Sequence, residues 1–438
     1  MDIDRKQFTL GLVVASMASG LHSATADAQG TDSMPTTPRA AHQTTYFFKN
    51  SAFEYVFLTA LGRAYHQGGN PGKVLYLTRQ VRDGDFEGAF QAFKAAGDEA
   101  SALADASLAK GRKESARQAY LWAQNYYDSA TYFVDGSADP SRFLPTWERL
   151  DACWTSAIAL FQVPGEPVEI PYEGVKLRGY YFRAPGAPGR RPLLIMNNGS
   201  DGSLLDMLTL GGFAALARGY DMLTFDGPGQ GYALWKQKLF FRPDWEKVIS
   251  PVVDYALTRS EVDPKRIALL GISQGGYWVP RAVAFEKRIA AAIADPGLVD
   301  VSTSWTAALP KPLIELIAAG RKAEFDAIMA KALDPAAKTA LGFRMRPYGF
   351  ESYFDTFKAT MDYRLADVAG QITCPMLVTA PANEAFWPGQ SQQLFEMLKA
   401  PKALVSFSDS GGGDLHCEPM AYGLRDLRIF DWLDEVLA

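Results

Sequence analysis

Short apolar runs alternate with helical stretches between residues 191 and 298, and this alternation restricts the fold more than any other feature. RPLLIM, YDMLTF, RIALLGIS and IAAAIAD have the length of buried strands. The segments between them, such as LDMLTLGGFAALARG, carry apolar residues at helical spacing. The pattern predicts an α/β fold with a mostly parallel, doubly wound sheet, covered by helices on both faces. Ligands of such sheets bind at the carboxyl ends of the strands.

Helical segments precede and interrupt this core. Residues 29–164 carry alanine and aromatic residues at three- and four-residue spacing, which predicts an irregular helical domain. We assign residues 165–298 and 371–438 to the α/β core. Residues 299–370 between them contain amphipathic helices without a strand. Because a connection of about 70 residues is far longer than usual, we predict an inserted helical cap over the strand ends.

Residues 1–28 have the layout of an export signal. Arg5 and Lys6 precede an apolar stretch from Phe8 to Leu21, and small residues follow up to an A-x-A motif that ends at Ala28. The stretch is shorter than the roughly 20 residues of a membrane span. We expect cleavage near Ala28 and a periplasmic or secreted protein, by a general or a twin-arginine route. A disordered tail is the alternative.

Composition limits the partners. The net charge is −5 and there is no basic run, so nothing indicates nucleic acid. Three cysteines give no disulfide framework, and free thiols are expected. We predict no metal, no organic cofactor and no membrane contact once the signal is removed. The helical domain either shapes the pocket or builds a homodimer.

The segment RIALLGISQGGYW leads a buried strand into a serine that stands between glycines. In a G-x-S-x-G elbow the backbone turns sharply from strand to helix, and the glycines allow the two to approach. The hydroxyl of Ser273 would then be exposed at the tip of the turn. The alternative is an ordinary strand–turn–helix junction that happens to hold a serine.

A serine nucleophile needs a base and an acid that orients it. His416 is the only histidine after the elbow, and it lies in a glycine-rich loop after the last candidate strand. Glu384 follows the penultimate strand, where enzymes with a serine elbow usually carry an aspartate. We predict that Glu384 is the acid that orients His416. Asp362, Asp409 and Asp414 are the alternatives for the acid, and Glu384 would then be a solvated loop carboxylate.

An oxyanion hole requires two preorganised N–H donors. The amide of Gln274, directly after the nucleophile, is the first candidate. The amide of Ser200, in the loop NNGSDG after the strand RPLLIM, is the second. The alternative for this loop is a plain polar turn.

The motifs NNGSDG, FDGPGQG, GISQGG and GDLHCEP occur in the order found in α/β-hydrolases. With the N-terminal helices and the insertion, residues 45–438 resemble the branch that holds the fungal pigment-pathway polyketide-shortening hydrolases, the pseudooxynicotine hydrolases and the fermentation-respiration-switch-like proteins. The resemblance implies an α/β-hydrolase fold and a serine hydrolase. Some members of that branch cleave a carbon–carbon bond beside a carbonyl and carry an acidic residue one position past the oxyanion donor, which here is Asp201. Capping of the following helix is the other role open to Asp201.

Aromatic residues flank the expected pocket: Tyr277 and Trp278 after the elbow, and Phe386 and Trp387 in the acid loop. They favour a small apolar or aromatic acyl substrate. The leading hypothesis is an exported serine hydrolase that cleaves a carboxylic ester through an acyl-enzyme. The alternatives are a carbon–carbon hydrolase of the β-diketone type that also uses Asp201, a peptidase, and a non-catalytic ligand-binding protein on a hydrolase fold.

Overall fold

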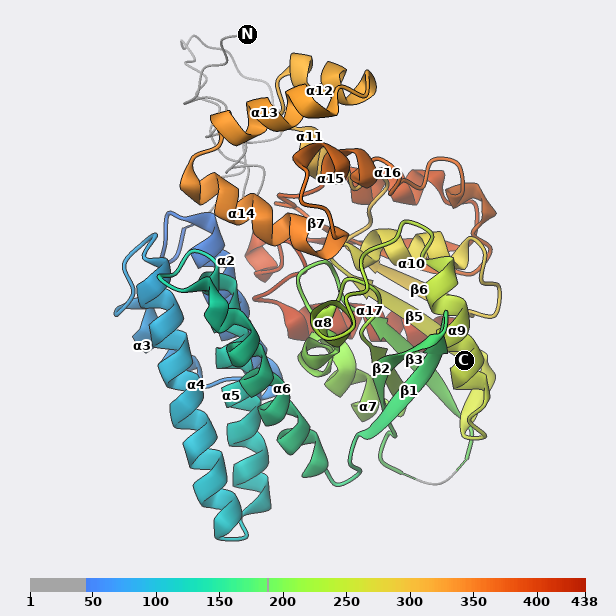
Figure 1. Ribbon diagram of the computed structural model, residues 1–438. Helices are drawn as coiled ribbons and strands as arrows, with labels where there is room; N and C mark the ends of the chain where they lie inside the picture. The colour runs from blue at the N-terminus through green and yellow to red at the C-terminus, as the bar shows by residue number, and fades with distance from the viewer. Residues whose placement is uncertain (1–44, 187–188) are drawn as a thin grey trace, which may run out of the picture.

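The computed structural model describes residues 45–186 and 189–438, which form a helical bundle, a sheet-based core and a helical insertion (Figure 1). The predicted export signal, residues 1–28, lies outside this range. Across the described part of the chain, every helix is too short or too polar to span a bilayer.

The described residues contain one eight-stranded sheet in the order β1-β2-β4-β3-β5-β6-β7-β8. β1 pairs antiparallel with β2, and β2 with β4, whereas every pair from β4 across to β8 is parallel. The predicted mostly parallel sheet is therefore confirmed. The strands are β1 (Glu166–Tyr172), β2 (Val175–Phe182), β3 (Arg191–Asn197), β4 (Asp221–Phe225), β5 (Val262–Ile272), β6 (Ala291–Asp295), β7 (Met376–Pro381) and β8 (Lys402–Phe407).

Both faces of the sheet are buried, which explains the continuous apolar runs. In β3, Leu193 and Ile195 point to one face, and Leu194 and Met196 to the other. The first face packs against α9 (Glu246–Leu257), α10 (Gly275–Val283) and α16 (Gln390–Met397). The second packs against α7 (Phe213–Ala217) and α17 (Tyr422–Val436). The short helix α8 (Gly231–Trp235) follows β4.

The N-terminal helices share one core with the second face of the sheet. The rings of Trp154 and Tyr180 meet edge to face at 4.7 Å, and this contact joins the bundle to β2. Figure 1 shows the bundle beside the sheet, with its two longest helices extending past it. The helices are α2 (Ser51–Gly62), η1 (Arg63–His66), α3 (Pro71–Thr78), α4 (Phe86–Ala109), α5 (Lys113–Val134), η2 (Pro140–Arg142) and α6 (Phe143–Ala159).

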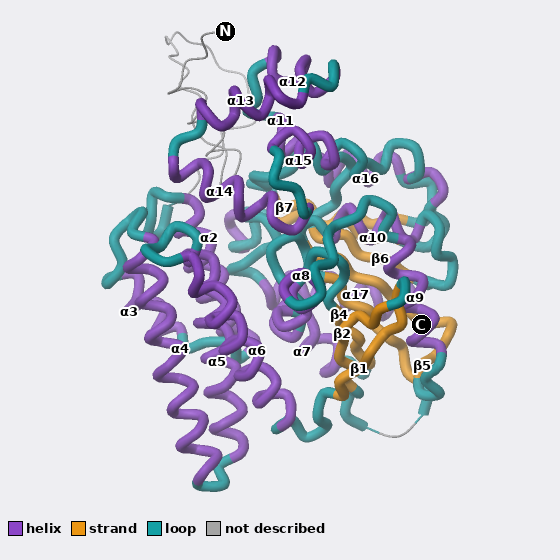
Figure 2. The backbone as a smooth tube through the Cα atoms, in the orientation of Figure 1, coloured by secondary structure: helices purple, strands orange, loops and turns teal. Residues whose placement is uncertain are grey.

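Between β6 and β7 the described chain contains helices joined by turns and loops, and no strand beyond an isolated bridge between Asp300 and Arg364 (Figure 2). This is the segment, residues 299–370, that we expected to be a cap. Its apolar residues, among them Leu313, Phe325 and Phe357, continue the core of the first face. The elements are α11 (Thr303–Thr306), α12 (Lys311–Ala318), α13 (Lys322–Ala332), α14 (Pro335–Met345), η5 (Arg346–Tyr348), α15 (Tyr353–Thr360) and η6 (Ala369–Gln371).

The helix expected over LDMLTLGGFAALARG is broken. It consists of η3 (Leu204–Asp206), the irregular turn η4 (Leu208–Gly212) and α7. Gly211 has φ +121°, a left-handed value outside the helical range. At Gly212 a Cβ would lie 2.7 Å from the sulfur of Met222. The apolar spacing predicted the buried face correctly, but the backbone leaves helical geometry at Leu210 and Gly211 and becomes helical again at Gly212.

Candidate active site

The turn at Ser273 is a strained strand-to-helix corner. Ser273 stands between β5 and α10 with φ +55°, and its amide donates to the carbonyl of Asp295 at 2.6 Å. A non-glycine residue in this region costs about 1–3 kcal/mol, which the surrounding packing must offset. At Gly271 a Cβ would lie 2.3 Å from the carbonyl oxygen of Gly275. The motif glycine is therefore required for the close approach of strand and helix.

The structure brings Ser273, His416 and Glu384 together. His416 Nε2 lies 2.8 Å from Ser273 Oγ, and His416 Nδ1 lies 2.7 Å from Glu384 Oε2. Because a carboxylate can only accept, Nδ1–H donates to Glu384 and Nε2 is left to accept the proton of the serine. Asp414, one of the alternative acids, instead accepts from the side chain of Asn383 at 2.7 Å.

The surroundings of the pair favour its charged form. Burial alone would lower the pKa of His416, but the charge and hydrogen bond of Glu384 outweigh it and raise this pKa. Burial would raise the pKa of Glu384, yet His416 and the amides of Phe386 and Trp387 lower it. Glu384 is therefore ionised at neutral pH and can stabilise an imidazolium at His416.

These shifts predict the pH dependence of nucleophilic attack. Neutral His416 is needed to accept the proton of Ser273, and its pKa is raised above the ordinary value. We expect the rate of labelling by a fluorophosphonate to fall as the pH is lowered through a pKa above about 6.5, the usual histidine value. Labelling for fixed times at pH values between 5 and 9 measures this rate. A rate that stays constant down to pH 5 would contradict the role of His416.

A residue of the N-terminal bundle supports the histidine loop. The hydroxyl of Tyr55, in α2, donates to the backbone carbonyl of His416 at 3.0 Å. The next two residues, Cys417 and Glu418, have positive φ angles of +57° and +47°, so this loop is strained. No sequence pattern indicates Tyr55, because the contact joins positions 361 residues apart.

The loop after β3 passes directly over the elbow. At Gly199 a Cβ would lie 2.5 Å from Ser273 Cβ, so the loop backbone touches the serine. The side chain of Gln230 holds the loop by donating to the carbonyls of Asn198 and Gly199 at 2.7 and 2.8 Å. Within the described residues, the N–H groups of Ser200 and Gln274 donate to no other backbone group. Both residues line the cavity above Ser273.

Asp201 faces the same cavity. Ser200 Oγ donates to Asp201 Oδ1 at 3.0 Å. Asp201 is accessible from the cavity, and protein surrounds its other sides. Loss of hydration within the surrounding protein raises the pKa of Asp201. The hydrogen bond from Ser200 and the positive charges of Arg344 and His416 act in the opposite direction. The helix-capping alternative for Asp201 is wrong, because Ser203 caps η3.

The cavity has a volume of about 520 Å³ and is mainly apolar. The N-terminal bundle, the core and the insertion all contribute to its wall. Phe386 and Trp387 line it as predicted, with ring centroids 4.8 and 5.8 Å from that of His416. Trp305 lines it too, and the structure also adds Tyr55 and Arg344 to the wall.

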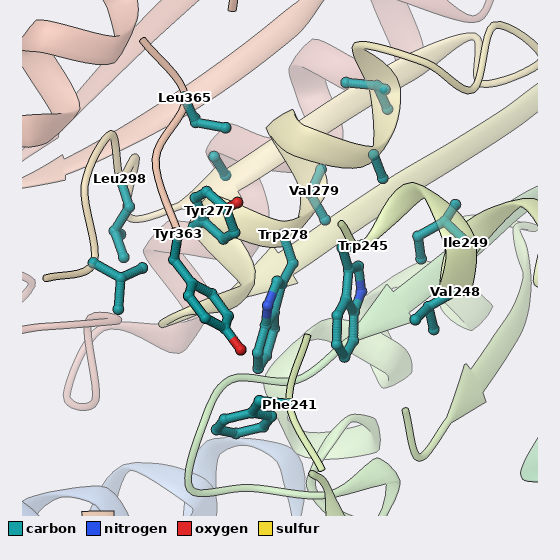
Figure 3. Close-up of a cluster of buried hydrophobic side chains, with 14 of the residues drawn as sticks. Phe241, Trp245, Val248, Ile249, Tyr277, Trp278, Val279, Leu298, Tyr363 and Leu365 are labelled. Carbon is teal, nitrogen blue, oxygen red and sulfur yellow. The ribbon is translucent and has the colours of Figure 1, made fainter. Parts of the chain in front are cut away.

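Tyr277 and Trp278 do not line the cavity, and this part of the pocket prediction is wrong. Figure 3 shows both rings within the apolar cluster under α10. Trp278 stacks on Trp245 at 4.2 Å, and Tyr277 donates from its hydroxyl to the carbonyl of Pro243 at 2.9 Å. They lie one helical turn beyond Ser273, on the side of α10 that packs on the core.

Replacing Trp278 by alanine should therefore destabilise the fold instead of altering substrate preference. The ring is fully buried against Trp245, and its removal is expected to lower the free energy of unfolding by about 3–5 kcal/mol. Urea unfolding measures this change. Phe386→Ala is the matched variant, because it removes a ring that faces the cavity; it should alter KM with less effect on stability. The reverse result would place Trp278 in the pocket.

Comparison with known proteins shows the family to which the chain belongs. A model described as the alpha/beta hydrolase family matches residues 184–421. Hydrolase LUC6 of Fusarium is 30% identical over 407 residues, which cover 89% of this chain and 97% of that one. The 20-hydroxy-prefusarin hydrolase FUS2 of Gibberella moniliformis is 29% identical over 414 residues, covering 89% and 98%.

Among solved structures, the 2,6-dihydroxy-pseudo-oxynicotine hydrolase is similar with a TM-score of 0.67 and 23% identity, over 86% of this chain and 95% of that one. The resemblance expected from the motifs is thereby confirmed, as is the fold class. The chain belongs to the alpha/beta hydrolase family and is a hydrolase.

Proposed function

We propose that the protein is a serine hydrolase that cleaves a carboxylic ester or similar acyl bond of a small apolar or aromatic substrate. The main support is one geometric observation: Ser273 Oγ, His416 and Glu384 form a continuous hydrogen-bonded chain, with links of 2.8 and 2.7 Å, at a cavity lined by aromatic rings. A relative named for its substrate acts on 20-hydroxy-prefusarin, which favours a small molecule over a peptide.

In the proposed reaction His416 Nε2 takes the proton of Ser273 as Oγ attacks the carbonyl carbon. The amides of Gln274 and Ser200 hold the resulting oxyanion, and Glu384 stabilises the imidazolium. The imidazolium then gives its proton to the leaving group. A water molecule, deprotonated by His416, attacks the acyl-enzyme and releases the acid.

Labelling by a fluorophosphonate tests this function. The folded protein should react at one residue, identified by peptide mass spectrometry as Ser273. Ser273→Ala should not react. If the folded wild-type protein remains unlabelled, the proposal fails and the chain is better described as a ligand-binding member of its family.

Cleavage of a carbon–carbon bond beside a carbonyl is the second candidate, and Asp201 is the observation that favours it. Its carboxyl group faces the cavity with a raised pKa, so it is suited to carry a proton. After attack by Ser273, the electron pair of the broken bond passes to the leaving carbon as an enolate. Protonated Asp201 would supply the proton that this carbon takes up.

A panel of p-nitrophenyl esters and 1,3-diketones separates the two candidates. If carbon–carbon cleavage is correct, wild type should turn over diketones, and Asp201→Asn should abolish this while ester turnover survives. Equal loss of both activities, or of neither, would exclude the proton-transfer role of Asp201. Hydrolysis of esters alone would favour the first candidate.

Export remains part of the proposal on the basis of residues 1–28 alone. We expect the mature protein recovered from the native host to begin after Ala28. N-terminal sequencing of that protein checks this, and an intact residue 1–28 segment would contradict it.

A further inference from the structure

The loop that carries the proposed oxyanion donor Ser200 is closed by its own hydrogen bonds. Asn198 Oδ1 accepts from the amide of Gly199 at 2.7 Å, and Asn198 Nδ2 donates to the carbonyl of Ser203 at 2.7 Å. At Gly202 a Cβ would lie 2.2 Å from Asn198 Nδ2, so the loop winds tightly around this side chain. The position of the Ser200 amide therefore depends on where Asn198 and Ser203 are held.

Asp206 holds both ends of this loop. Its Oδ2 accepts from the amide of Ser203 at 2.9 Å and from Nδ2 of Asn198 at 3.0 Å. The carboxylate is buried, with 3% of its side chain exposed. A buried carboxylate needs a positive partner, because burial removes the water that would otherwise solvate its charge.

That partner comes from the N-terminal bundle. Nη2 of Arg63, in η1, lies 3.0 Å from Asp206 Oδ1. Nη1 of the same guanidinium donates to Asp128 Oδ2, in α5, at 2.6 Å. Arg63 is thus fixed between a carboxyl group of the bundle and a carboxylate that holds the loop, and its side chain is buried between them.

Asp128 shares the guanidinium on the bundle side. Burial and the negative charge of Asp206 raise the pKa of Asp128 well above its usual value, although Arg63 acts in the opposite direction. Asp128 therefore tends towards its neutral form, and the charge of Arg63 remains to balance Asp206. Of the two contacts, the one to Asp206 joins the bundle to the loop.

We propose that Arg63 and Asp206 are positioning residues for the oxyanion hole: through their ion pair the N-terminal bundle holds the loop that presents the Ser200 amide. The inference rests on the proposed function, because it concerns a donor of that same site. Neither residue has to touch the reacting atoms, since the effect passes through Asn198 and Ser203. A displacement of about 1 Å in such a donor is enough to lose much of its effect on the transition state.

Two ketones measure the oxyanion hole separately from the shape of the cavity. With 1,1,1-trifluoro-4-phenylbutan-2-one, a bond forms from Ser273 Oγ to the carbonyl carbon, the π electron pair moves to the oxygen, and the serine proton passes to His416. The oxygen of this adduct occupies the oxyanion hole. The parent 4-phenylbutan-2-one fills the same cavity without a stable adduct. The ratio of their two dissociation constants, measured by calorimetry, is the trifluoro preference, and it depends on where the donors lie.

Asp206→Asn and Asp128→Asn are matched variants, because each turns one carboxyl partner of the same guanidinium into an amide. Asp206→Asn should lower the trifluoro preference by about 10- to 100-fold, and should lower kcat and kcat/KM of any hydrolysed ester by the same factor. Asp128→Asn should leave the preference unchanged, because it resembles the protonated form and keeps the link to Asp206. Arg63→Lys should fall between them, since an ammonium lacks the planar fork that reaches both carboxyl groups.

An unchanged trifluoro preference in Asp206→Asn or in Arg63→Lys would overturn the inference. An equal loss in Asp128→Asn would also overturn it, since any altered charge in this cluster would then have the same effect. If Asp206→Asn fails to fold, Arg63→Lys still decides the question, because it retains the positive charge. Wild-type protein that shows no trifluoro preference and no fluorophosphonate label would refute the proposed function and this inference with it. Labelled wild-type protein whose variants keep the preference would refute the inference alone.

Discussion

Replacing Ser273 by alanine is expected to lower kcat by roughly 10⁴- to 10⁶-fold for any substrate that the protein hydrolyses. The substitution removes the hydroxyl that lies 2.8 Å from His416 Nε2, and no other nucleophile would occupy its place at the turn. Residual activity would come from binding and from the oxyanion donors alone. Steady-state hydrolysis of the best ester or diketone of the panel measures the loss.

Ser273→Gly is the matched variant for this experiment. It removes the same hydroxyl but is free of the strain that φ +55° imposes on a side chain. Both variants should be equally inactive, while Ser273→Gly should be more stable than Ser273→Ala by about 1 kcal/mol in urea unfolding. If Ser273→Ala keeps more than a few per cent of wild-type kcat, the serine mechanism is wrong.

Glu384→Gln is expected to lower kcat by roughly 10³- to 10⁴-fold at neutral pH. The glutamine can donate to Nδ1, and His416 would then hold its proton on Nε2, the nitrogen that has to accept from Ser273. Loss of the carboxylate also removes the main cause of the raised pKa of His416. The remaining activity should therefore decline at a lower pH than in wild type, which a pH–rate profile measures.

Two variants control for the loop that carries Glu384. Glu384→Asp keeps the charge on a shorter side chain and should retain more activity than the glutamine variant. Asp414→Asn alters a neighbouring carboxylate that is bound to Asn383, and it should have little effect on kcat. A large loss of kcat in Asp414→Asn together with a small loss in Glu384→Gln would show that Asp414, and not Glu384, is the acid of the triad.

The central part of the fold could be read from the sequence because its strands are buried on both faces. Runs such as RPLLIM and RIALLGIS have no polar side, and only a parallel sheet between two helical layers buries them fully. The interruption at Leu210 and Gly211 was missed, since apolar spacing carries no information on a backbone that leaves the helical range.

The site was predictable where chain order sets the geometry. In parallel strands the loops that carry Ser273, Glu384 and His416 must emerge at one edge of the sheet, so motif order was sufficient to suggest their meeting. Tyr277 and Trp278 were misplaced because proximity in sequence does not say which side of α10 a ring occupies. Tyr55 and Arg344 come from helices outside the sheet, and no local pattern indicates how those helices pack over it.

The shared core of the N-terminal helices and the sheet has a consequence for how the molecule denatures. Trp154 and Tyr180 belong to one buried cluster that runs from the bundle into β2 and β3. Shortening the chain to begin at β1 would uncover that face and yield an insoluble product. Calorimetry of the full chain should accordingly show bundle and sheet melting in a single transition, with no separate low-temperature peak for the helices.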